Sequence, residues 1–289
     1  MNLTRAEAQN RELSSRAKRP GSLLAVLGGK GGVGKTNVAT NVAVAASRLG
    51  ARVLLVDGDL GLANVDVLLG LTPRCTAAEI LSGERELADA ILEGPAGVHV
   101  VPAASARMDL AASRPAQLAA LLGPLLECGH AYDCVIVDVG AGIGPSAISL
   151  AAVCDRAWIV TTPEPTSVTD AYGTLKVLRR TAPDLPTSLL VNDARSESQA
   201  LATHSQLERI AARFLDTPLP LAGIVPRDSH VEDAVAKQKA VVEQFPTAPA
   251  SRRLIELAGR VLAGPPPPES HEAGIGEHVS QKTWKRFES

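Results

Sequence analysis

The chain has 289 residues, of which 45% are hydrophobic, and this is enough apolar material for a large buried core. A formal net charge of −2 gives no overall attraction to nucleic acid, and no apolar run reaches the roughly 18 residues of a membrane-spanning helix. The polar N-terminus lacks the apolar segment of a signal peptide, so we expect a cytoplasmic protein. The cysteines form no C-x-x-C pair, which argues against a zinc site or a disulfide framework.

Residues 1–20 are predicted to be a polar segment that precedes the folded domain. Thr4 and Glu7 have the spacing of a capping box, which predicts the start of a short helix. Its apolar positions are too few for the helix to be stable alone. The segment is therefore interpreted as a solvated tail, with a partner-binding helix as the functional alternative.

From residue 23 onward, short apolar runs alternate with helix-length segments. The strands are predicted at Leu23–Leu27, Val53–Val56, Val98–Val101, Val135–Val137, Trp158–Thr161, Leu189–Val191 and Leu221–Val225. The helices are predicted at Val38–Leu49, Pro115–Cys128, Val168–Arg180 and Gln199–Phe214. Most of the strands are apolar on both faces, as in a parallel sheet covered on both sides. We therefore predict one α/β domain over residues 21–263, with a doubly wound, mostly parallel sheet.

Residues 264–289 are predicted to be a proline-rich spacer followed by a polar tail. Pro265–Pro268 form a stiff, extended spacer. Trp284 and Phe287 lie beside basic residues near the C-terminus, and such a composition occurs both in disordered tails and in small membrane-surface anchors. The tail lacks a clear amphipathic helical pattern, so both interpretations stay open.

The strongest motif lies directly after the first predicted strand. The segment Gly29–Thr36 reads GKGGVGKT, which satisfies G-x-x-x-x-G-K-[ST] and leads into a predicted helix. In such a loop the backbone N–H groups turn inward and surround phosphate oxygens, and the positive end of the following helix points at the same anion. Lys35 is expected to reach the β- and γ-phosphates, and the Thr36 hydroxyl is expected to bind Mg²⁺.

The same glycines also fit the dinucleotide pattern G-x-G-x-x-G, with Asp57 at the end of the next strand. A dinucleotide site has no use for a lysine and a threonine directly after the third glycine. Asp59 and Asp138 add two further carboxylates that follow or close strands. Several carboxylates facing a phosphate loop suit a hydrated Mg²⁺ better than a ribose, so the sequence favours ATP and Mg²⁺ over NAD.

Lys30, early in the loop, makes this sequence resemble the deviant Walker A motif of the MinD/ParA ATPases. The resemblance covers residues 22–262 and is greatest to the flagellar-number regulators of the FlhG/FleN (YlxH-like) branch. It rests on the loop and on the segments Val56–Gly70, Tyr132–Ile143, Thr161–Tyr172, Val191–Asn192 and Pro226–Lys239. In this family the early lysine reaches the phosphates of the partner in a homodimer that encloses two nucleotides.

The resemblance implies a role for each matched residue. Lys30 and Lys35 would neutralise phosphate charge, Asp59 would orient the attacking water, and Thr36, Asp57 and Asp138 would hold Mg²⁺ and its water shell. The remaining nucleotide contacts would come from Gly29, Gly31, Gly32, Val33, Gly34, Asn37, Glu164, Asn192, Pro226 and Asp228. Among these, Glu164 would act across the dimer, and Asn192 and the Pro226–Asp228 turn would line the adenine. Helix or loop capping is the ordinary alternative for Asn192, Asp228 and the three strand-end aspartates.

The resemblance implies a slow, partner-stimulated ATPase that dimerises with ATP and controls flagellar number or placement. The expected partners are a flagellar protein or the GTPase FlhF, and a membrane contact through the C-terminal tail would make the protein peripheral. Only Gln9 and Leu13 match the D-Q-A-x-x-L-R motif with which this branch stimulates FlhF.

A ParA-like ATPase that partitions DNA or a cargo is the main alternative. It lacks support from a long basic run, and nucleic acid is not an expected partner. An iron–sulfur carrier of the same fold would place a cysteine soon after Asp138, and none follows until Cys154.

Overall fold

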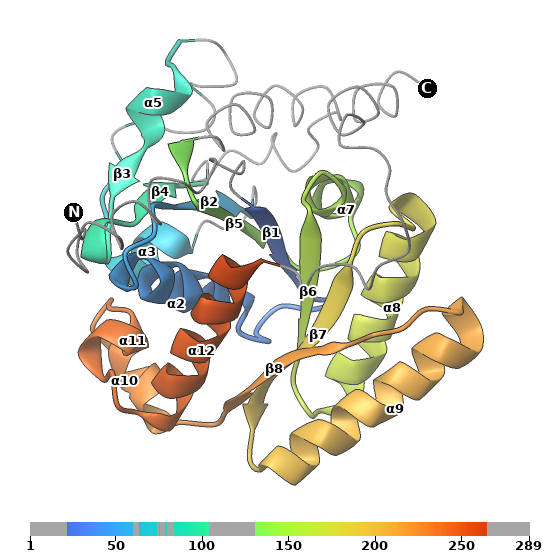
Figure 1. Ribbon diagram of the computed structural model, residues 1–289. Helices are drawn as coiled ribbons and strands as arrows, with labels where there is room; N and C mark the ends of the chain where they lie inside the picture. The colour runs from blue at the N-terminus through green and yellow to red at the C-terminus, as the bar shows by residue number, and fades with distance from the viewer. Residues whose placement is uncertain are drawn as a thin grey trace, which may run out of the picture.

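The computed structural model describes residues 22–59, 64–73, 75, 79, 84–103 and 131–264. Its described strands form one sheet in the order β3-β4-β2-β5-β1-β6-β7-β8 (Figure 1). The strands are β1 (Ser22–Leu27), β2 (Val53–Gly58), β3 (Leu92–Glu93), β4 (His99–Val101), β5 (Cys134–Val139), β6 (Arg156–Thr161), β7 (Thr187–Ala194) and β8 (Leu221–Pro226). All neighbouring pairs are parallel except β3 with β4. The prediction of a mostly parallel, doubly wound sheet is therefore confirmed.

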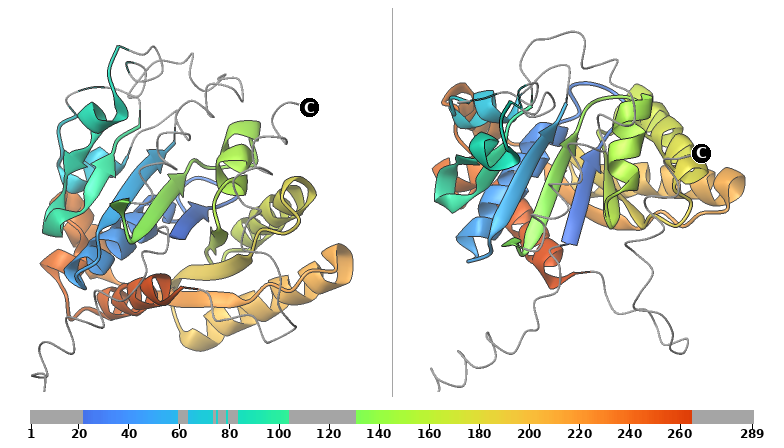
Figure 2. Two further views of the ribbon diagram at one scale, coloured as in Figure 1. Left: turned by 45° about the horizontal axis from the view of Figure 1, so that its top comes forward. Right: turned by 90° about the horizontal axis from the view of Figure 1, so that it is seen from above.

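Helices cover both faces of this sheet (Figure 2). One face carries α2 (Lys35–Arg48), α10 (Ser229–Ala236), α11 (Val241–Gln244) and α12 (Pro249–Ala263), and the other carries α7 (Pro145–Ala152), α8 (Pro165–Thr181) and α9 (Glu197–Leu215). Three shorter helices, α3 (Val65–Leu69), α5 (Leu87–Ala90) and the 3₁₀ turn η1 (Pro95–Gly97), belong to the β2–β4 part of the chain.

Side-chain alternation along the central strand explains this layering. In β1, Leu24 and Val26 are buried in the apolar cluster under α2 and α12, whereas Ala25 and Leu27 are buried in the cluster under α7 and α8. Successive strand residues point to opposite faces, so a strand that is apolar throughout must be covered twice. The apolar runs in the sequence carry this information directly.

The seven predicted strands all exist, although most are longer than predicted. The short antiparallel edge strand β3 was not predicted, because two residues give no periodic signal. Helix α8 begins at Pro165 and α12 at Pro249, since proline is well tolerated in the first turn of a helix. The predicted helix at 115–128, the N-terminal segment and the C-terminal tail lie outside the described residues. Within the described part of the chain, no helix is long and apolar enough to cross a bilayer.

Candidate functional site

The carboxyl ends of the central parallel strands carry the groups that the sequence analysis singled out. The phosphate loop joins β1 to α2, while Asp57 lies near the end of β2 and Asp138 near the end of β5. Asp57 and Asp138 are cross-strand partners in the β2–β5 register, and Val26 of β1 pairs with Asp138 on the other side. The crevice outside the carboxyl ends of an open parallel sheet is the expected ligand position in this class of fold.

The loop has the geometry of a phosphate cradle. Gly34 precedes α2 with φ 90° and ψ 20°, a left-handed conformation that side chains disfavour. A β-carbon at Gly34 would also lie 2.2 Å from the Asn192 amide nitrogen, so a side chain here would have to displace the Asn192 amide. The amide nitrogen of Asn192 in turn donates to the Val33 carbonyl at 2.9 Å, which holds the loop from the end of β7.

Lys35 and two aspartates form a buried charged cluster beneath the loop. Lys35 is 7% exposed, Asp57 4% and Asp138 1%. Burial lowers the Lys35 pKa, although Asp138 and Asp59 oppose this effect by attraction. Burial raises the pKa of Asp57 to about 6 and that of Asp138 to about 7. Buried carboxylates are unfavourable when they lack a cation, so this cluster is suited to receive one.

The arrangement fits a magnesium ion that keeps most of its water. The Thr36 hydroxyl hydrogen-bonds to the Asp138 carboxylate, and Asp138 Oδ1 is buried without a hydrogen-bond partner in the part of the chain that the structure describes. No group of three acidic, histidine or cysteine side chains among the described residues is close enough to enclose a metal directly. Mg²⁺ bound with a nucleotide typically takes one or two protein ligands and retains several waters. The Thr36 hydroxyl would be such a ligand, and the Asp138 carboxylate would accept hydrogen bonds from the retained waters.

Asp57 has a structural role in the segment that follows β2, and its role at the metal ion stays a prediction. Its Oδ2 accepts the backbone N–H groups of Asn64 and Val65 at 3.0 and 3.1 Å, and its Oδ1 accepts that of Asp59 at 3.0 Å. The bonds from Asn64 and Val65 satisfy amide groups at the start of α3, so the capping alternative raised in the sequence analysis is present. Asp57 therefore links the strand end to the segment that follows it.

Lys30 points away from the cluster beneath the loop. Its Nζ lies 3.0 Å from Glu164 Oε2 and 3.1 Å from Thr166 Oγ1, at the start of α8. The Lys30 side chain is 33% exposed and that of Glu164 is 67% exposed. Thr166 was not among the predicted site residues. Only its position two residues after Glu164 could have indicated it.

A cavity of about 340 Å³ lies on the outer side of the loop. It combines loop residues with strand-end and helix residues from β6 to α12, namely Lys30, Gly31, Gly32, Val33, Gly34, Asn37, Val38, Thr162, Glu164, Asn192, Asp193, Val225, Pro226, Asp228, Val231, Glu232 and Leu254. The structure thus brings Asn37, Glu164, Asn192, Pro226 and Asp228 together beside the loop, as predicted. Thr162 also lines the cavity and was not predicted. Its buried Oγ1 has no hydrogen-bond partner among the described residues.

Asp228 is also a capping residue. Its Oδ1 accepts the His230 N–H at 3.0 Å at the start of α10, and its Oδ2 accepts the Ala250 N–H at 3.0 Å at the start of α12. The side chain therefore fastens two helix ends to one wall of the cavity. The capping alternative accounts for both of its carboxylate oxygens, and a contact of Asp228 with adenine stays a prediction.

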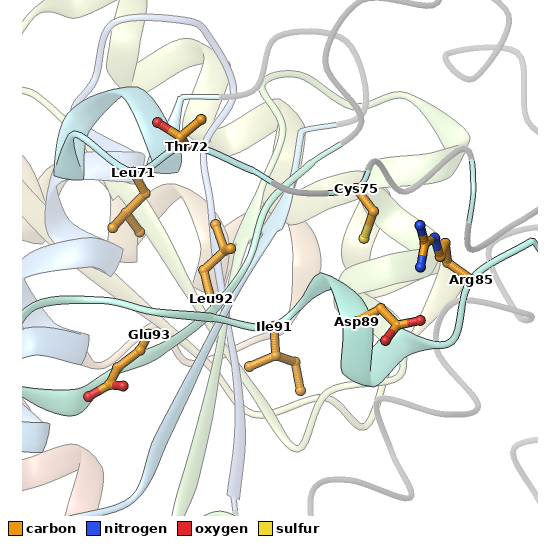
Figure 3. Close-up of a pocket in the computed structure, with 8 residues that line it drawn as sticks. All are labelled: Leu71, Thr72, Cys75, Arg85, Asp89, Ile91, Leu92 and Glu93. Atoms are coloured by element: carbon orange, nitrogen blue, oxygen red, sulfur yellow. The ribbon is translucent and has the colours of Figure 1, made fainter.

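A larger cavity, of about 750 Å³, lies elsewhere (Figure 3). Leu71, Ile91 and Leu92 form its apolar wall, while Arg85 and Asp89 lie near Cys75 on its other side. None of its described lining residues borders the phosphate loop or the buried aspartates. The loop crevice, with its glycine cradle and buried charges, is therefore the candidate site in spite of its smaller volume.

Comparison with known proteins agrees with this geometry. Residues 24–241 match the family model described as the CobQ/CobB/MinD/ParA nucleotide binding domain. The chain is 43% identical to the antiactivator FleN of Pseudomonas aeruginosa, over 91% of this chain and 94% of that protein. It is 30% identical to the flagellum site-determining protein YlxH of Helicobacter pylori, over 83% and 81%. The septum site-determining protein MinD of Pyrococcus horikoshii, solved with Mg-ADP, superimposes with a TM-score of 0.70 at 27% identity, over 84% and 97%.

Proposed function

Because the chain belongs to the CobQ/CobB/MinD/ParA family of nucleotide-binding domains, we propose that it is an ATP-hydrolysing dimerisation switch that controls flagellar number or placement. The glycine cradle and the buried Lys35–Asp138 cluster support a nucleoside triphosphate with Mg²⁺. The name of the YlxH relative, a flagellum site-determining protein, supports the flagellar process. Each part of the proposal has its own test.

The proposed chemistry is in-line attack of water on the γ-phosphate, for which positioning and charge stabilisation suffice. Lys35 neutralises charge on the β- and γ-phosphates. Thr36 would hold the metal ion, and Asp138 and Asp57 would bind its water shell. Asp59 orients the attacking water. It directly follows β2 and lies beside Gly140, where an added β-carbon would be 3.2 Å from the Asp59 carboxyl carbon. Bound Mg²⁺ supplies additional stabilisation for the negative charge that develops on the phosphate oxygens.

The position of Lys30 is the observation that carries the dimer part of the proposal. Within one chain its ammonium group is bonded to Glu164 and Thr166, at the rim of the crevice, rather than to the buried aspartates. An exposed ion pair of this kind contributes only about 0–1 kcal/mol, so a phosphate from a second copy can displace Glu164 at little cost. Lys30 then contacts the partner's nucleotide, and Glu164 becomes available for a contact across the same interface.

Phosphate release from MgATP tests the enzymatic part. The wild-type chain is expected to hydrolyse MgATP slowly, Lys35→Ala to bind it poorly, and Asp59→Ala to bind it but release phosphate at least tenfold more slowly. Asp216→Asn, which alters an exposed carboxylate at the end of α9, is the matched control and keeps the wild-type rate. Equal rates for Asp59→Ala and Asp216→Asn would remove Asp59 from the mechanism.

A deletion in the native host tests the flagellar part. Loss of the gene is expected to change the number or placement of flagella per cell, counted by electron microscopy. The wild-type gene restores the pattern, whereas a gene carrying Lys35→Ala does not. An unchanged pattern in the deletion strain would overturn the flagellar assignment, even for an active ATPase.

We propose that residues 269–289 attach the dimer to the membrane surface. Asp59→Ala is expected to pellet with anionic vesicles in MgATP but not in MgADP, and to lose this when residues 269–289 are deleted. If it stays in the supernatant in both nucleotides while it is dimeric, the tail is not an anchor.

A further inference from the structure

Two asparagines one turn apart on α2 and the backbone of α11 form a buried hydrogen-bond chain. Asn41 is 1% exposed, and its Nδ2 donates to the Asn37 carbonyl at 2.8 Å and to Asn37 Oδ1 at 2.9 Å. Its Oδ1 accepts the Val242 N–H at 3.2 Å, from a residue 201 positions later in the chain. The predicted roles of the phosphate loop do not require Asn41 or Val242.

The polarity of this chain follows from its two backbone members. A backbone N–H can only donate and a backbone carbonyl can only accept, so the Val242 N–H requires the Asn41 oxygen and the Asn37 carbonyl requires the Asn41 nitrogen. A reversed Asn41 amide would place two donors against each other at Val242 and two acceptors at Asn37. The Asn41 orientation is thus fixed without reference to hydrogen positions.

The same argument fixes the side chain of Asn37. Because Asn41 presents N–H groups, the Asn37 atom that faces it must be the oxygen Oδ1. The Asn37 Nδ2 group is then the part of this half-buried side chain that remains for a ligand in the cavity that Asn37 lines. That group can only donate, so the ligand atom beside it must be an acceptor.

A phosphate oxygen is the acceptor that best suits the place of Asn37 in the fold. Asn37 directly follows Thr36 in the first turn of α2, whose N-terminus attracts anions. A donor on an uncharged amide also forms a stronger hydrogen bond with an ionised oxygen than with a neutral one. A carboxylate at position 37 would repel the same anion.

We infer that Asn41 is a positioning residue: it holds the Asn37 amide so that Nδ2 donates to a nucleotide phosphate, and it ties this orientation to α11. This inference rests on the proposed nucleotide-binding function. The Arg48 side chain donates to the Val242 carbonyl at 2.6 Å and the Ser251 hydroxyl donates to the Val241 carbonyl at 3.1 Å, so α11 is fastened by three side chains. Asn41 also bonds to Asn37, which lines the cavity.

A double-mutant cycle tests the inference with MgADP as the ligand, measured by calorimetry. Asn37→Ala and Asn41→Ala are each expected to weaken MgADP binding roughly tenfold. Asn37→Ala removes the hydrogen bond to the charged phosphate, and Asn41→Ala removes the bond that orients the Asn37 amide toward it. Asn37→Ala/Asn41→Ala is expected to be no weaker than Asn37→Ala alone, because Asn41 acts only through Asn37. Adenosine, which lacks phosphate, is expected to bind all of these variants as it binds the wild type.

Ser251→Ala is the matched control for stability. It removes another bond that fastens α11 but leaves Asn37 untouched, so it is expected to lower the melting temperature and keep the wild-type affinity for MgADP. If Asn41→Ala behaves like Ser251→Ala, or if its loss of affinity adds to that of Asn37→Ala, the positioning role is wrong. If the wild-type chain does not bind MgADP at all, the proposed function fails and this inference fails with it.

Discussion

Two glycines of the phosphate loop, Gly29 and Gly31, are expected to respond very differently to alanine. A β-carbon at Gly29 would lie 2.3 Å from the backbone carbon and oxygen of Asp170, whereas one at Gly31 would meet nothing within 4 Å. The Asp170 carbonyl lies within α8 and also accepts the Thr174 hydroxyl at 3.0 Å, so it cannot move aside like a flexible side chain. Gly29 therefore lies where α8 packs tightly against the loop.

The loss of stability expected for Gly29→Ala follows from this contact. Overpacking against a rigid neighbour costs about 1–3 kcal/mol, and we expect Gly29→Ala to lie at the upper end of that range. With roughly 2–4 °C per kcal/mol in a domain of this size, the melting temperature should fall by roughly 4–12 °C. Gly31→Ala should change stability by no more than about 0.5 kcal/mol.

Thermal unfolding of the two variants, without nucleotide, measures this difference. The same substitution at two positions of one loop controls for the loss of glycine flexibility in the unfolded chain. Equal melting temperatures for Gly29→Ala and Gly31→Ala would refute the close contact between the loop and α8, and with it the described geometry of the crevice.

Three further outcomes follow from the site. Burial raises the Asp138 pKa from 3.8 to about 7, so the folded protein binds the extra proton and stability should fall as pH rises from about 4 to 7, by roughly 4 kcal/mol in the limit. Asp138→Asn should remove this part of the fall in melting temperature and leave the part due to Asp57, whose pKa burial raises to about 6. The same variant should bind Mg²⁺-nucleotide more weakly. Asn192→Ala removes the bond to the Val33 carbonyl and should weaken MgADP binding roughly five- to tenfold, measured by calorimetry, and an unchanged affinity would contradict its support of the loop. Asp228→Ala removes the caps of α10 and α12 and should cost about 1–3 kcal/mol in chemical denaturation, and a loss below 0.5 kcal/mol would show that the caps are dispensable.

Most of the fold could be predicted from the sequence because its strands are buried on both faces. An uninterrupted apolar run such as Cys134–Val137 is typical of a strand in the middle of a parallel sheet that helices cover on both faces. The edge strand Leu92–Glu93 could not be predicted, since it is defined only by its partner strand. The start of α8 at Pro165 was predicted too late, at Val168, because the apolar periodicity begins after the first turn.

The part of the candidate site that consists of the phosphate loop could be predicted, because one short motif contains all of its residues. The loop Gly29–Thr36 and the strand-end aspartates fall together because parallel strands bring their carboxyl ends to one edge. The dual role of Asp228 was not predictable, because its second capping partner, Ala250, is 22 residues away. The role of Asn41 could not be predicted either, because its partner Val242 is 201 residues away in the sequence.

The central claim is that ATP joins two copies of this chain through Lys30. Light scattering of Asp59→Ala after gel filtration tests it most directly. The account predicts a doubled mass in MgATP, a monomer in MgADP, and a monomer in both nucleotides when Lys30→Ala is added. A monomer in MgATP with nucleotide bound, or a dimer that persists with Lys30→Ala, would contradict it.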